Sequence, residues 1–114
     1  MGYEDMKLIT KAIENQLAAA PLYSQDEKNA SDVKVIAKFF NAYGTGTWYI
    51  TEGDKHSKSE DYLFFGLCSI HEAELGYVRL SDLKRIKGIE RDLHWSGTLA
   101  DAQRIESVRG RAIR

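Results

Sequence analysis

The fold of this chain is decided at Thr47-Trp48-Tyr49-Ile50-Thr51-Glu52-Gly53-Asp54, which is followed after a short polar gap by Asp61-Tyr62-Leu63-Phe64-Phe65-Gly66-Leu67. Both runs are rich in aromatic and β-branched residues, which favour strands. The second run is apolar on both faces, as is typical of a strand that is covered on both sides. We expect the two runs to form the centre of a sheet, joined by a loop over residues 53–60 with acidic residues at both of its ends.

Further strands are predicted on either side of this centre. Apolar residues alternate with polar ones over 33–43, and the glycines that follow predict a hairpin into 47–52. The same patterns predict strands over 62–70, 74–80 and 89–95.

Three helices are predicted around the strands. Thr10 is placed to cap an amphipathic helix that Pro21 ends, and this helix is expected to lie on the sheet as a lid. Ser81 is placed to cap a short helix that Gly88 ends, and Thr98 is placed to cap a C-terminal helix. The apolar face of that last helix is expected to consist of Leu99, Ala102, Ile105 and Val108.

The order of these elements predicts one α+β domain over residues 1–114, built on a mostly antiparallel sheet of about five strands. It comprises an N-terminal helix, four strands, a short helix before the last strand, and a C-terminal helix. At 43% hydrophobic and 29% charged residues, the composition is that of a globular chain. No apolar run approaches the length of a membrane span. The single cysteine, Cys68, cannot form an internal disulfide, so we expect a cytoplasmic protein without membrane association.

The charges are distributed unevenly along the chain. Residues 1–78 carry seven lysines against twelve acids, a net charge of −5, whereas residues 79–114 carry nine cations against five acids, a net charge of +4. The second part holds all the arginines, which are Arg79, Arg85, Arg91, Arg104, Arg109, Arg111 and Arg114. Arginine suits carboxylates and phosphates, so this cluster indicates an anionic partner. Pairing of the arginines with nearby acids is the alternative.

The acids around residues 52–61 are the first candidate site. Carboxylates that converge from strand ends can bind Mg²⁺, and a metal-dependent nuclease or other phosphodiesterase could be built on Glu52, Asp54, Asp61 and Glu90. Acids at strand ends also stay solvated and keep strand edges from aggregating. Spacing alone does not show convergence, so we assign no metal, no cofactor and no catalytic residue.

Other candidates are equally open to two interpretations. Arg91 lies between apolar residues, which predicts an ion pair with Glu52 or Glu74, or else a ligand contact. Cys68 next to the His71-Glu72 pair allows a nucleophile, although a cysteine in an apolar strand is more often a core residue. Several strand aromatics could stack on nucleic-acid bases or could form the core, namely Trp48, Tyr49, Tyr62 and Tyr77.

Four motifs carry a resemblance to a known family. They are Thr-Trp-Tyr-x-Thr-Glu-Gly-Asp at 47–54, Asp-Tyr-Leu-Phe-Phe-Gly-Leu at 61–67, Glu-Leu-Gly-Tyr-x-x-Leu-Ser-Asp-Leu at 74–83 and Ile-Glu-Arg-Asp-Leu at 89–93. In this order they resemble the small bacterial domain of unknown function numbered twenty-nine fifty-eight, over about residues 7–95. The Arg-rich tail over 96–114 departs from that pattern. The resemblance implies a context of plasmids, phages and integrated mobile elements, and no established activity or catalytic residues.

We therefore expect a non-enzymatic interaction or regulatory protein of a phage, plasmid or integrated mobile element. An inhibitor of host defence, such as an anti-CRISPR or antirestriction protein, is one form of it. The expected partner is a protein, bound through the sheet edge and the Arg-rich C-terminal helix. The alternatives are the metal-dependent nuclease and a small nucleic-acid-binding module that uses the Arg-rich C-terminal third. The expected partner-binding residues are Glu52, Asp54, Asp61, Arg91, Arg104, Arg109 and Arg111.

Overall fold

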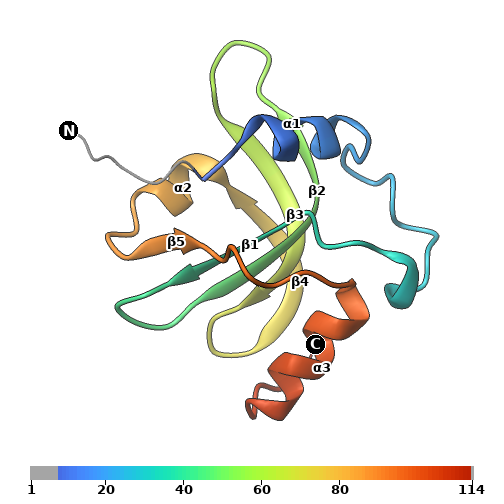
Figure 1. Ribbon diagram of the computed structural model, residues 1–114, viewed down its shortest axis with the longest axis vertical. Helices are drawn as coiled ribbons and strands as arrows, with labels where there is room; N and C mark the ends of the chain where they lie inside the picture. The colour runs from blue at the N-terminus through green and yellow to red at the C-terminus, as the bar shows by residue number, and fades with distance from the viewer. Residues whose placement is uncertain (1–7, 114) are drawn as a thin grey trace.

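The computed structural model describes residues 8–113, which form three helices, one 3₁₀ turn and five strands. In chain order the elements are α1 (Lys11–Ala18), η1 (Ala30–Asp32), β1 (Ala37–Asn41), β2 (Thr47–Lys55), β3 (Tyr62–Ser69), β4 (Ala73–Arg79), α2 (Leu80–Lys84), β5 (Ile89–Arg91) and α3 (Leu99–Val108). The strands form a single antiparallel sheet in the order β4-β3-β2-β1-β5 (Figure 1). The predicted α+β class, with its three helices in their predicted places, is confirmed.

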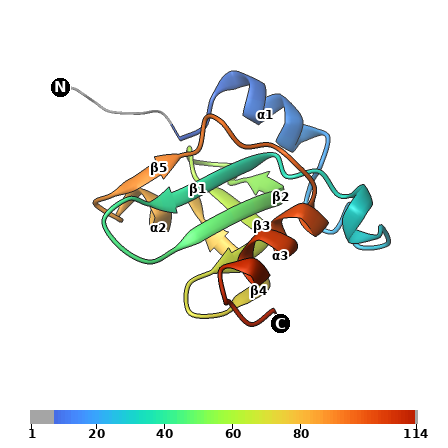
Figure 2. The same cartoon turned by 60° about the horizontal axis from the view of Figure 1, so that its bottom comes forward.

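The two faces of the sheet carry different layers. Phe39, Ile50 and Phe64 lie on the face that α1 and α2 cover, which we call the α1 face. Tyr49 and Leu67 lie on the opposite face, the α3 face, where the start of α3 packs. Figures 1 and 2 show α1 and α3 separated by the strands. The α1 face carries the larger apolar core. Buried polar side chains and exposed apolar side chains both lie on the α3 face.

The capping residues in the sequence predicted the starts of two helices correctly. The Thr10 hydroxyl accepts a hydrogen bond of 3.2 Å from the N–H of Ile13, which caps α1. Thr98 and Asp101 form a reciprocal capping box at the start of α3. The predicted apolar face of α3 was only half right, because Leu99 and Ala102 are buried but Val108 is 84% exposed. The buried position in the last turns is Glu106.

Helix α2 is capped differently from the prediction. It begins at Leu80 and ends at Lys84, before Gly88, and Ser81 lies inside it. The N–H and the hydroxyl of Ser81 instead donate to the carboxylate of Asp61, at 2.9 and 2.8 Å. The acceptor comes from 20 residues upstream, where a local sequence pattern does not reveal it.

Strand ends depart from the predicted bounds where the chain turns to meet α3. Residues 33–36 lie outside β1, since Val35 donates to the carbonyl of Gly97 and Leu99 donates to the carbonyl of Val33. Strand β2 continues to Lys55 opposite Tyr62, through a bulge between Ile50 and Glu52.

Strand β5 is shorter than predicted and ends at Arg91. The next N–H, from Asp92, still donates to the carbonyl of Lys38, and the chain then leaves the sheet. It crosses the α3 face so that the ring of Trp95 meets the ring of Tyr49 edge-on, with centroids 5.3 Å apart. Packing of Trp95 on the sheet therefore replaces the last part of the predicted strand.

Candidate functional site

Glu52 and Asp54 hold the loop that follows α1. The buried Glu52 carboxylate accepts hydrogen bonds from the N–H groups of Tyr23, at 2.8 Å, and Gln25, at 2.9 Å. Asp54 accepts one from the N–H of Leu22, at 3.2 Å. Tyr23 has a φ of +74°, a conformation that costs energy in a residue with a side chain, and these bonds offset that cost. The structure thus brings the two predicted acids together, with backbone N–H groups as their partners.

Asp61 binds a different segment, the first turn of α2. Glu90, the fourth acid of the proposed nuclease site, lies on β5, which is separated from β2 by β1. Within residues 8–113, no group of three or more His, Cys, Asp or Glu side chains is placed to bind a metal ion. The convergence that the nuclease interpretation requires is therefore not found in the described part of the chain.

Asp61 gives a prediction about pH. Its slight burial raises the pKa, but the hydrogen bonds from the hydroxyl and N–H of Ser81 outweigh this and hold the pKa below its ordinary value of 3.8. The unfolded chain therefore binds a proton at a higher pH than the folded chain does. The stabilisation by Asp61 is fully present above that ordinary value and is lost as the pH falls through the lower folded pKa. We expect Asp61→Asn to make the loss of stability in acid shallower.

Urea unfolding midpoints measured between about pH 5 and pH 2 test this expectation. Glu60→Gln is the matched control, because Glu60 adjoins Asp61 and its exposed carboxylate lies 3.6 Å from the ammonium group of Lys55, away from α2. Equal acid slopes for wild type and Asp61→Asn would contradict the role given to Asp61.

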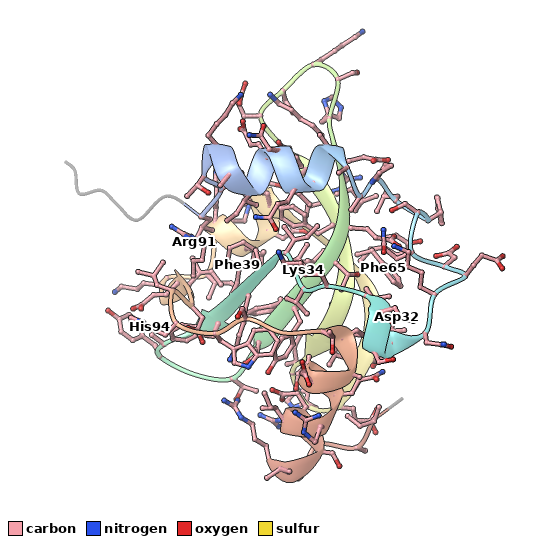
Figure 3. The ribbon with its side chains drawn as sticks, turned by 45° about the vertical axis from the view of Figure 1, so that its right-hand side comes forward. Asp32, Lys34, Phe39, Phe65, Arg91 and His94 are labelled. Carbon is pink, nitrogen blue, oxygen red and sulfur yellow. The ribbon has the colours of Figure 1, made fainter. Side chains whose placement is uncertain are left out.

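The predicted arginines lie in three separate places. Arg91 lies on β5 opposite Phe39, and in Figure 3 it is on the other side of the molecule from Phe65. Strands β5 and β4 are the two edges of the sheet, which separates Arg91 from Glu74. Arg104 is exposed on α3 and pairs with Asp101 at 3.0 Å. Only Arg109 and Arg111 come together, beside the hairpin between β1 and β2.

These two arginines line a pocket of about 310 Å³, which we call the basic pocket. Its other walls are Lys38, Asp92 and the hairpin residues 40–47, except Ala42 and Tyr43. Lys38 is buried, its Nζ is 3.2 Å from a carboxylate oxygen of Asp92, and it lies 5.3 Å from the centroids of both the Tyr49 and the Trp95 rings. Two rings and one acid thus hold the ammonium group in one position.

A buried hydrogen-bond network lies beneath this pocket. The fully buried carboxylate of Glu106 accepts from the hydroxyl of Tyr49 and from the hydroxyl of Ser69, each at 2.6 Å. Burial and the hydrogen bond to Glu106 both raise the pKa of Tyr49. A guanidinium nitrogen of Arg109 lies 3.8 Å from the Glu106 oxygen that accepts from Tyr49. Sequence reasoning missed Glu106, although its spacing from Leu99 and Ala102 places it on the same face of α3.

An apolar surface lies on the part of the α3 face formed by β3 and β4, away from the basic pocket. We call it the edge surface, and it consists of Phe65, Leu75 and Tyr77 together with Tyr23, whose side chain is hydrogen-bonded to that of Tyr77. Tyr23 is 64% exposed, Tyr77 is 51% exposed and Leu75 is 42% exposed, and the rings of Phe65 and Tyr77 have centroids 5.0 Å apart. Exposed apolar groups that adjoin one another are typical of interaction sites. Sequence reasoning named Tyr77 among candidate stacking aromatics and missed Tyr23 and Leu75.

The edge surface adjoins backbone groups that the sheet does not use. The N–H of Ala73 points away from β3 and donates to the carbonyl of Ala112. Because the direction alternates along an antiparallel strand, the N–H groups of Leu75 and Tyr77 also point outward. Within residues 8–113, neither of these two groups forms a hydrogen bond. Strand β4 therefore combines outward backbone donors with exposed apolar side chains.

The remaining candidates are accounted for by the core. Burial raises the pKa of the Cys68 thiol to about 11, which makes it a poor nucleophile. Of the aromatics considered for base stacking, Trp48, Tyr49 and Tyr62 are buried. None of the helices in the described part of the chain has the length and apolar character of a membrane span.

Comparison with protein families matches residues 8–109 to the family described as Protein of unknown function (DUF2958). The match continues past residue 95, where the sequence resemblance ended, and includes all of α3. The family therefore extends beyond the expected limit of about residue 95 and takes in α3, which packs on the α3 face. Neither curated proteins nor solved structures gave a match to the chain. The chain belongs to the family described as Protein of unknown function (DUF2958).

Proposed function

We propose that this chain is a non-enzymatic interaction protein that binds a partner protein by adding one of the partner's strands to β4. The combination of outward N–H groups and exposed apolar side chains on this one strand carries the proposal. In this mode of recognition, main-chain hydrogen bonds supply affinity and alternate side chains supply specificity. Leu75 and Tyr77 are two positions apart on β4, so their side chains point to the same face of the sheet.

The C-terminal segment supports strand addition at this edge. Ile113 pairs with Ala73 in a short parallel bridge, and the N–H of Ala73 binds the carbonyl of Ala112. Residues 112–113 thus occupy the first position of β4, and no other segment among residues 8–113 pairs with the outer side of this strand. They also connect the end of α3 to this sheet edge.

The biological setting of the proposal comes from the family resemblance. We place the protein in the cytoplasm of a bacterium that carries a phage, plasmid or integrated mobile element. An inhibitor of a host defence system, of the anti-CRISPR or antirestriction kind, is the concrete form that we favour. The acids Glu52 and Asp54 then act indirectly, by holding Tyr23 in the edge surface.

Leu75→Pro tests strand addition directly. Proline removes the outward N–H of Leu75, which no sheet hydrogen bond uses, so we expect the fold to lose no more than about 1 kcal/mol of stability. We expect the affinity for the partner to fall at least about tenfold, since the added strand loses a hydrogen bond and meets the proline ring. The partner is first purified with the tagged wild-type protein from cells that carry the element, and dissociation constants are then measured with purified components.

Tyr43→Ser is the matched control for Tyr77→Ser. Tyr43 is 76% exposed, more than Tyr77, and lies on the hairpin between β1 and β2, away from β4. We expect Tyr77→Ser to weaken binding and Tyr43→Ser to leave it unchanged. A folded Leu75→Pro variant with wild-type affinity, or equal losses in the two tyrosine variants, would contradict the proposal.

A further inference from the structure

We propose that the basic pocket is a second binding site, separate from the edge surface, which takes the phosphate group of a small phosphomonoester. The pocket lies between the β1–β2 hairpin and the end of α3, and its volume of about 310 Å³ is at the lower end of the range for small-molecule sites. That volume exceeds what a lone phosphate ion requires, so the pocket also has room for a group attached to the phosphate.

The charges around the pocket favour an anion. Three of its four ionisable groups are cations, namely Lys38, Arg109 and Arg111, and the fourth is Asp92. Asp92 already accepts hydrogen bonds from the ammonium group of Lys38 and the N–H of His94. Burial raises the pKa of Asp92, but these bonds outweigh it and hold the pKa below its ordinary value, so the acid stays ionised and paired.

The two arginines are less fully paired with protein groups than Asp92 is. Arg109 is 3.8 Å from Glu106, whose two carboxylate oxygens already accept short hydrogen bonds from Tyr49 and Ser69. No acid among residues 8–113 forms an ion pair with Arg111. Both guanidinium groups therefore keep N–H donors that an added anion can bind through charge-assisted hydrogen bonds.

The C-terminus of α3 is capped by backbone N–H groups, without the arginine side chains. Gly110, with a φ of +89°, allows the N–H of Arg111 to bind the carbonyl of Glu106 and its own N–H to bind that of Ser107. The terminal carbonyl groups therefore have backbone partners. The guanidinium groups of Arg109 and Arg111 remain available to a ligand in the pocket.

The pattern of donors distinguishes phosphate from carboxylate. A phosphomonoester carries close to two negative charges near neutral pH and offers three oxygens, so it gains from cations on several sides. The pocket provides the fixed ammonium group of Lys38 from the sheet and two guanidinium forks from the end of α3. A single carboxylate has one charge and two oxygens, and it would leave part of this set unmatched.

Titration at low salt with inorganic phosphate, adenosine monophosphate and acetate tests the inference. We expect both phosphates to shift the amide resonances of the hairpin and of residues 109–111, with the nucleotide binding more tightly, and we expect no such shift with acetate. Arg111→Gln should weaken nucleotide binding at least about tenfold through loss of a charge-assisted contact. Arg104→Gln, on the exposed side of the same helix, should bind like wild type.

Each other outcome counts against the inference. Absence of binding by both phosphates, equal affinity for acetate, or equal binding by the Arg111→Gln and Arg104→Gln variants would overturn it. Tighter binding of a 5′-phosphorylated oligonucleotide than of the mononucleotide would overturn the assignment to a small molecule. The Leu75→Pro variant should bind the nucleotide normally, so this test succeeds or fails independently of strand addition at β4.

Discussion

Gly66→Ala is expected to destabilise the protein by about 3 kcal/mol or more, because the sheet backbone leaves no room for a methyl group. A Cβ at position 66 would overlap the carbonyl oxygen of Tyr49 and lie 2.8 Å from its carbonyl carbon and 2.9 Å from the Cα of Ile50. These are backbone atoms of the neighbouring strand, so no side-chain rotation relieves the overlap. Strand β3 would have to move away from β2, which is the middle strand of the sheet.

Gly76→Ala is the matched control, since Gly76 lies directly opposite Gly66 on β4. Apart from its two neighbours in the chain, no heavy atom of residues 8–113 lies within 4 Å of a Cβ at position 76. This substitution should leave stability within about 1 kcal/mol of wild type or raise it, because alanine restricts the unfolded chain. Thermal and urea unfolding of the two variants provide the comparison, and equal effects would contradict the close approach of β2 and β3.

Glu106→Ala is expected to cost about 3–5 kcal/mol, the range for removing one member of a buried polar cluster. The hydroxyls of Tyr49 and Ser69 would lose their common acceptor while both remain buried. Each buried donor left without a partner costs about 1–3 kcal/mol, and the removed side chain also leaves a cavity. Urea unfolding of the variant measures the sum.

The triple variant Tyr49→Phe, Ser69→Ala, Glu106→Leu provides the control. It removes the carboxylate and both hydroxyls together, so no unpaired donor remains, and we expect it to recover a large part of the lost stability. If the triple variant is as unstable as Glu106→Ala, the loss arises from packing and the hydrogen-bond account of this cluster is wrong.

Short-range features of this fold were predictable from the sequence. The aromatic and β-branched runs around Tyr49 and Phe64 predicted strands because the signal lies within each run. Thr10 and Thr98 predicted helix starts because each cap bonds an N–H three residues ahead. The antiparallel α+β class followed from the order of such local elements.

Long-range polar contacts were not predictable in the same way. Glu52 bonds N–H groups 29 and 27 residues away, Asp61 bonds Ser81 across 20 residues, and Glu106 bonds Tyr49 across 57 residues. An acid in a sequence looks the same whether its partner is water, a metal ion or a distant backbone group. The acids that suggested a nuclease were therefore visible as residues, and their structural roles were not.

The candidate sites show the same division. The strand at β4 was predicted, but its position at the sheet edge depends on β5 pairing with β1 at the other end of the sheet. The Arg-rich C-terminal third was evident from composition, whereas the meeting of Arg109 and Arg111 with Lys38 depends on how α3 packs on the sheet. Strand order and helix placement are properties of the whole chain, and periodicity in a short window does not contain them.

Amide hydrogen exchange along β4, measured residue by residue in the free protein and in the complex with its purified partner, tests strand addition most directly. In the free protein we expect slow exchange at Glu74, Gly76 and Val78, whose N–H groups face β3, and fast exchange at Leu75 and Tyr77. In the complex, Leu75 and Tyr77 should become slow as well, since their outward N–H groups then bind the added strand. If both amides still exchange fast in a saturated complex, the partner does not bind by strand addition to β4.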